Sequence, residues 1–106
     1  MNEEGYKRYS EILAKYGNIL ETVLKCDKDE ASFILFALVV GMEDCYSKMN
    51  LKDNKIDARV FNDTAHYYTY IVLLINRFED IYDDDAWNII NKCNDFFASE
   101  YTILFE

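Results

Sequence analysis

Hydrophobic side chains recur with a helical period along most of the chain. The first such stretch covers residues 4–25, where apolar positions fall three or four residues apart and charged residues lie between them. This spacing places the apolar side chains on one face of an α-helix. The pattern predicts a first amphipathic helix over residues 4–25, with an inward face made of Tyr9, Ile12, Leu13, Tyr16, Ile19, Leu20, Val23 and Leu24.

A second helix is predicted to begin after Asp27. Glu30 follows Asp27 by three residues, which is the spacing of a capping box with Asp in place of Ser or Thr. The run Phe33–Val40 is apolar on every side of a helix, so this helix should be the most buried of the set. We expect it to reach about Met49, and we expect Gly41 to permit the close approach of a neighbouring helix.

Residues 50–57 are polar and charged, and they form the predicted linker to a third helix. The start of this helix has two interpretations. It extends back toward Asn54, or it begins after an N-cap at Asn62 or Asp63. Its apolar positions continue to Tyr82.

Three consecutive aspartates, at positions 83–85, precede a final amphipathic segment. The inward face of this predicted helix consists of Trp87, Ile90, Cys93, Phe97, Tyr101 and Leu104. The chain has no proline and three glycines, which favours long helices with short joints. We therefore predict an all-α fold, a compact and mostly antiparallel bundle of about four helices that forms a single domain over residues 1–106.

The composition is apolar enough to fold and strongly acidic. Hydrophobic residues make up 51% of the 106 positions, which is too many for a disordered chain. The net charge of -9 disfavours direct contact with nucleic acid or anionic membranes and favours a basic protein partner. Residues with AT-rich codons are abundant, which indicates a low-GC bacterium or one of its phages.

The chain shows no sign of export or of a membrane span. Its three cysteines are an odd number at wide spacing, and the N-terminus has neither the basic nor the apolar region of a signal peptide. The longest apolar run is far shorter than the roughly 20 residues that cross a bilayer. We expect a cytoplasmic protein without disulfides.

Nothing in the sequence identifies a reaction. The single histidine, His66, has Asp63 three residues before it and Tyr70 four residues after it, so the two could orient its ring. A Cys–His pair is one interpretation, and a histidine without chemistry is the other. Metal-ligand spacings and glycine-rich phosphate loops are absent from the sequence. We predict no enzyme activity, no metal and no cofactor.

The acidic residues divide into two groups. Six of them stand at predicted helix starts, where the helix dipole favours negative charge: Asp27, Asp29, Glu30, Asp83, Asp84 and Asp85. Glu79 and Asp80 differ, because they fall in the last turn of the predicted third helix, where the dipole disfavours anions. The charges of residues 1–26 cancel, whereas residues 83–106 sum to -5. This asymmetry points to an acidic surface near the last helix.

Tyrosines add to this surface. Tyr67, Tyr68 and Tyr70 are too close in sequence for all three to point inward on one helix, so Tyr67 or Tyr70 should reach the surface. Exposed tyrosine is common at binding hot spots. The predicted partner-binding residues are Glu79, Asp80, Asp83, Asp84, Asp85, Asp95, Tyr67 and Tyr70.

These features predict a small acidic protein-binding module that docks on a basic partner, such as a nucleic-acid-binding protein or nuclease, as an inhibitor or immunity-type protein. In size, charge and lack of enzyme motifs the chain resembles bacterial immunity proteins, antitoxins and phage-encoded inhibitors of host defence, including anti-CRISPR proteins. The resemblance covers no motif. The alternative is a structural protein that forms a homodimer through Tyr67, Tyr70 or Phe105. A bundle that holds a small ligand between its helices is a third class.

Overall fold

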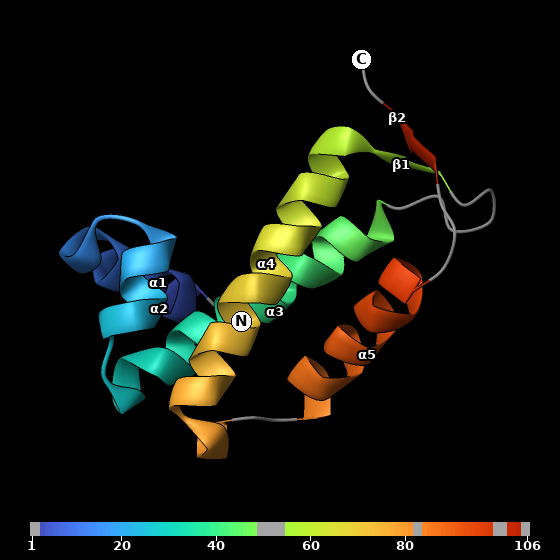
Figure 1. The fold of residues 1–106 in the computed structure, drawn as a ribbon. Helices are drawn as coiled ribbons and strands as arrows, with labels where there is room; N and C mark the ends of the chain where they lie inside the picture. The colour runs from blue at the N-terminus through green and yellow to red at the C-terminus, as the bar shows by residue number, and fades with distance from the viewer. Residues whose placement is uncertain (1–2, 49–54, 82–83, 99–101, 105–106) are drawn as a thin grey trace.

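The computed structural model describes residues 3–48, 55–81, 84–98 and 102–104, with the backbone alone for residues 96, 97 and 102–104. This part of the chain is almost entirely helical, which confirms the all-α fold class (Figure 1). It contains five α-helices where about four were predicted: α1 (Glu3–Tyr16), α2 (Ile19–Lys25), α3 (Lys28–Ser47), α4 (Ala58–Arg77) and α5 (Asp84–Ala98). A single 3-10 turn, η1 (Glu79–Ile81), follows α4.

Helix α3 is the centre of the fold. It contacts α1, α4 and α5, and Ile34, Leu38 and Met42 along it are fully buried. Figure 1 shows α4 running back across α3 in the opposite direction, with α5 returning beside them. One side of α3 stays open to solvent, where Phe33 is 39% and Phe36 is 42% exposed. Helix α3 nevertheless has more buried residues than any other described helix, which confirms the prediction that it is the most buried of the set.

The predicted first helix is broken into two. Gly17 has a φ of +98°, a left-handed conformation that residues with a Cβ rarely adopt, and this ends α1. Asn18 then caps α2, because its side-chain oxygen accepts a hydrogen bond from the backbone N–H of Glu21 at 2.8 Å. The break changes the direction of the chain. Leu20 and Leu24, which were predicted to face inward, are each 46% exposed.

The start of α3 is fixed by the predicted capping box. The Glu30 N–H donates to Asp27 Oδ1 at 2.8 Å, and the Asp27 N–H donates to Glu30 Oε1 at 3.0 Å. The Glu30 carboxylate, 3% exposed, also accepts from the Tyr16 hydroxyl at 2.5 Å and from Lys15 Nζ at 3.0 Å. The Tyr16 hydrogen bond, followed by the Asp27 backbone and Lys15, lowers the pKa of Glu30 to about 2.

Helix α4 begins at Ala58, between the two predicted starts. Asp57 is its N-cap and accepts from the Arg59 N–H at 2.8 Å, so Asn62 and Asp63 lie inside the helix and the prediction of either as N-cap is wrong. The preceding predicted linker includes a short strand. The rest of that linker, residues 50–54, lies outside the described residues.

The two described strands form a parallel ladder that was not predicted. In it β1 (Lys55–Asp57) pairs with β2 (Thr102–Leu104), and Ile56 lies opposite Ile103. Helix α5 therefore ends at Ala98. The prediction that Leu104 belongs to a helical face is wrong, and Tyr101 lies outside the described residues.

Gly41 brings α3 and α4 together, as predicted. A Cβ placed on Gly41 would lie 2.7 Å from Cζ of Tyr67 and 2.9 Å from its hydroxyl oxygen, both closer than van der Waals contact allows. The ring of Tyr67 therefore packs directly on the backbone of α3. The absence of a side chain at position 41 is a condition for this contact.

Gly41→Ala should have opposite effects in two backgrounds. With Tyr67 present, the added methyl displaces the ring and should lower the free energy of unfolding by about 1 kcal/mol. In a Tyr67→Ala background the same change should raise it by about 1 kcal/mol, because alanine is the better helix former. Urea denaturation of the four proteins measures both effects. The same sign in both backgrounds would contradict the close packing.

Glu30→Gln should reduce stability in a pH-dependent manner. The folded pKa of Glu30 lies below its usual value of 4.5, so the stabilisation is complete above pH 4.5 and disappears as the pH falls toward 2. We expect the variant to lose about 1–2 kcal/mol at neutral pH, and the difference from the wild type to shrink near pH 3. Denaturation of both proteins between pH 3 and pH 7 measures this difference in the free energy of unfolding. Glu43→Gln, an exposed position on the same helix, is the control. A difference that does not change with pH would refute the assignment.

Candidate functional site

Glu79 and Asp80 do not lie in the last turn of an α-helix. Helix α4 ends at Arg77 with Phe78 as its C-cap, and the two acidic residues form the separate turn η1. The Asp80 carboxylate accepts a hydrogen bond from Lys28 Nζ at the start of α3, and this contact lowers the pKa of Asp80. The inference that both residues oppose a helix dipole was therefore wrong, and Asp80 has a structural partner.

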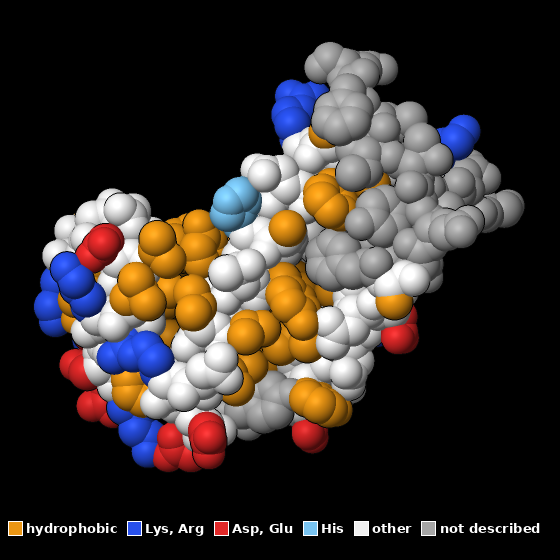
Figure 2. All heavy atoms as spheres, in the orientation of Figure 1, with side chains coloured by type: hydrophobic (Ala, Val, Ile, Leu, Met, Phe, Trp, Pro, Cys, Tyr) orange, Lys and Arg blue, Asp and Glu red, His pale blue; other side chains and the backbone are white. Residues whose placement is uncertain are grey.

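Asp84 and Asp85 begin α5, which confirms their predicted position at a helix start, while Asp83 lies outside the described residues. Asp85 faces α3, where it lines a pocket of about 290 Å³ with Glu43 and Lys92. Asp95 is exposed three turns along α5, on the same face as Asp84. Acidic side chains follow the lower edge of the view in Figure 2, from the start of α3 to α5.

Trp87 is the largest exposed hydrophobic side chain among the described residues. It is 52% exposed, whereas Ala86, Ile89, Ile90 and Cys93 face the core. The prediction of Trp87 on the inward face is wrong, because the core face of α5 is centred on its neighbours. We name Glu79, Asp80, Asp84 and Trp87 the acidic end. Trp87 follows Asp84 by three residues and therefore adjoins it on the helix surface, whereas Asp85 lies on the opposite side of α5.

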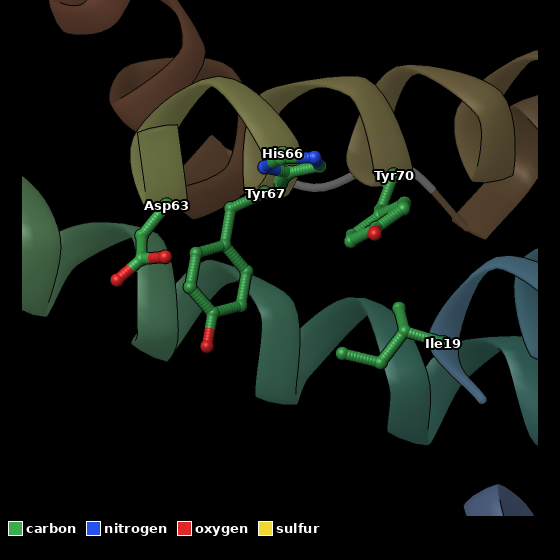
Figure 3. A pocket seen from close by; sticks show the side chains of 5 residues that line it. All are labelled: Ile19, Asp63, His66, Tyr67 and Tyr70. Carbon is green, nitrogen blue, oxygen red and sulfur yellow. The ribbon is translucent and has the colours of Figure 1, made fainter. Parts of the chain in front are cut away.

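Tyr67 and Tyr70 belong to a different surface. Both are partly buried, and with Ile19, Asp63 and His66 they line a pocket of about 350 Å³ between α2 and α4 (Figure 3). Asp63 and Ile19 approach the two tyrosine rings from opposite sides in this view. The structure thus separates the predicted tyrosines from the predicted carboxylates, since Tyr67 lies about 15 Å along α4 from the end of the helix.

A second pocket adjoins the first. It measures about 460 Å³ and shares Ile19 and Tyr70 with it. Leu13, Gly17, Asn18 and Leu20 line the rest. We name the two pockets together the α2–α4 groove. Figure 2 shows a hollow beside the histidine and hydrophobic side chains gathered over α1 and α2 next to it.

Arg77 holds one wall of the groove in place. Its guanidinium donates to the backbone carbonyls of Val23 and Cys26 at 2.8 Å each, so it satisfies carbonyls at the end of α2 from the end of α4. Arg77 therefore adds a long-range polar contact to the direct packing of α2 against α4. Residue spacing gave no indication of this contact.

The electrostatic state of the groove follows from burial and nearby acids. Burial raises the pKa of the Tyr67 hydroxyl, and the neighbouring thiol of Cys45 and carboxylate of Asp63 raise it further, so the phenol stays neutral. His66 is exposed, and its Nδ1 donates to the carbonyl of Asn62 at 2.8 Å, not to Asp63. The His66 and Tyr70 rings are 6.1 Å apart and tilted by 36°.

The candidate chemical groups lie apart in the part of the chain that the structure describes. The hydrogen bond of the His66 ring there is to the Asn62 backbone. The three cysteines are buried and free, and burial raises the pKa of each thiol, that of Cys93 to about 11. Within the described ranges, no three His, Cys, Asp or Glu side chains come together in a manner suited to a metal ion.

Comparison of the chain with models of protein families, with curated proteins and with solved structures finds no match. In the described parts of the chain, no helix combines the length and the apolar character needed to cross a membrane.

Two exposed residues of these surfaces, Leu20 and Trp87, were wrongly predicted to face inward. Leu20 was placed inward because residues 4–25 were treated as one helix, although Gly17 and Asn18 are the residue types of a helix stop and a new N-cap. Trp87 was placed inward because it falls on the helical period of the apolar positions in the last segment. The Gly–Asn pair was the available signal for the first, and no local signal existed for the second.

Arg77→Lys should loosen α2. Lysine lacks the planar fork that reaches two carbonyls at once, so we expect a loss of about 1–3 kcal/mol in the free energy of unfolding. Amide hydrogen exchange of α2 should accelerate more than that of α3. Arg59→Lys is the matched control, because the Arg59 side chain is 91% exposed. Among the described residues its ion pair is with Asp57, which does not belong to α2. Unchanged protection of α2 would contradict this role.

Proposed function

We propose that this chain is a protein-binding module for a basic partner, and that the acidic end is its contact surface. The observation that supports this most is Trp87, which stands 52% exposed beside Asp84. Tryptophan is the residue type most enriched at interface hot spots, and its ring also attracts lysine and arginine. An exposed tryptophan next to a carboxylate suits a surface that receives basic side chains.

The charge of the chain supports the same class of partner. A net charge of -9 accelerates association with a basic protein and disfavours direct binding to nucleic acid. A nuclease or another nucleic-acid-binding protein presents such a basic surface. Carboxylates on a rigid helix could occupy the positions on that surface where the partner binds phosphate groups. Inhibition of that partner is the function we propose for the module.

Self-association is a second candidate, supported by the open side of α3. Phe33 and Phe36 are exposed there one turn apart, and Arg8 lies 5.9 Å from the Phe33 ring. A homodimer through this side would bring two acidic chains together, so added salt should strengthen it. A complex with a basic partner should instead weaken as salt is added. Light scattering at low and high salt separates the two.

The acidic end can be tested by affinity capture from a native lysate, followed by binding measurements with the captured protein. We expect Trp87→Ser and Glu79→Lys each to weaken this binding at least about tenfold, with little change in melting temperature because both side chains are exposed. Phe36→Ser and Glu11→Lys are controls that make the same changes on other surfaces. Equal affinity of the Trp87 and Phe36 variants would refute the acidic end as the contact surface.

A further inference from the structure

The α2–α4 groove differs in chemistry between its two ends. At one end are the Asp63 carboxylate and the rings of His66 and Tyr67, and no lysine or arginine lines either pocket. At the other end are Leu13 and Leu20, and Ile19 and Tyr70 lie between the ends because they line both pockets. Asp63 forms no ion pair among the described residues, and Lys48 is near enough to interact with its charge without contacting it as an ion pair. The groove thus offers a place for a cation next to a place for an apolar side chain.

The wall formed by α2 is unusually apolar on its open side. Leu20 and Leu24 are each 46% exposed and lie one helical turn apart, so they form an i, i+4 ridge. Such ridges ordinarily pack into the grooves of another helix. Within the described chain α2 contacts α1 and α4, and neither covers this ridge.

We propose that the α2–α4 groove binds an amphipathic helical segment of a protein partner. A lysine or arginine of this segment lies beside Asp63, over the rings of Tyr67 and Tyr70, and leucine-sized side chains on the next turn pack on Ile19, Leu20 and Leu24. Recognition of a helix in a groove by a few side chains at helical spacing is a common mode of peptide binding.

Charge complementarity selects this occupant over a second copy of the chain. A second copy would bring another net charge of -9 toward Asp63, whereas a basic segment neutralises that carboxylate. The proposal extends the proposed function, because it assigns to the basic partner a helical segment that contacts a surface separate from the acidic end. The two surfaces can therefore be tested apart.

The probe is a synthetic peptide of about 18 residues, long enough to be helical alone, with leucine and arginine at helical spacing and alanine elsewhere. A scrambled peptide of the same composition is the control. We expect the ordered peptide to bind at least about tenfold more tightly than the scrambled one. Because both peptides carry equal charge, this difference measures the effect of the helical spacing alone. Binding of the ordered peptide should shift the amide resonances of α2 and of the first half of α4.

Variants of the protein identify the surface. Leu20→Asp should weaken peptide binding at least about tenfold, with Leu24→Asp as a second change of the same ridge. Asp63→Asn should weaken it about threefold to tenfold by removing the carboxylate. Phe36→Asp and Glu43→Gln make the matching changes on α3 and should leave the affinity unchanged. Circular dichroism confirms that each variant is folded.

Two outcomes overturn the proposal that the groove binds the peptide. One is equal binding of the ordered and scrambled peptides, and the other is the same loss of peptide affinity from Phe36→Asp as from Leu20→Asp. Binding that is lost in Trp87→Ser and kept in Leu20→Asp also overturns it and leaves the acidic end as the partner site. Peptide binding that requires Leu20 and Asp63 supports the groove, even where capture of the natural partner is insensitive to Trp87→Ser.

Discussion

The turn between α2 and α3 is the constraint on which the arrangement of the helices depends. Two side chains from distant parts of the sequence converge on it. Glu30 joins the start of α3 to Tyr16 and Lys15 at the end of α1, and Arg77 reaches from the end of α4 to the carbonyls of Val23 and Cys26. Four helices are thereby fixed to one another at one short turn. Because Glu30 is buried and Arg77 forms two bonds, the loss of either leaves polar groups without partners.

The parts of the fold that were predictable have local causes. The Asp27–Glu30 capping box and the small residue at Gly41 act through spacing and size, and the structure confirms both. The errors occurred where distant contacts decide. Strands β1 and β2 are three residues long and more than forty residues apart, so neither carries a recognisable period. The ion pair of Asp80 with Lys28 is equally invisible in the sequence, because the two residues are far apart along the chain.

The candidate site was predicted only in part for the same reason. Tyr67 or Tyr70 was expected to reach the surface because of the spacing of the tyrosines, and both are partly buried and line a pocket. Their separation from the acidic end, and the role of α2 as the opposite wall, follow from how the helices pack. The residues predicted to form one binding surface therefore lie on two separate surfaces with different chemistry. The acidic end offers charge and one aromatic ring, and the α2–α4 groove offers shape and apolar contact.

The packing of Tyr67 on Gly41 has a consequence for how this protein can change over generations. The same ring lines the groove and fills the space between α3 and α4, so a substitution that altered specificity there would also disturb the fold. Substitutions of Leu20 and Leu24 would disturb the core less, because nearly half of each residue is exposed to solvent. A lineage that must follow a changing partner would accumulate its differences along α2, while positions 41 and 67 vary together or not at all.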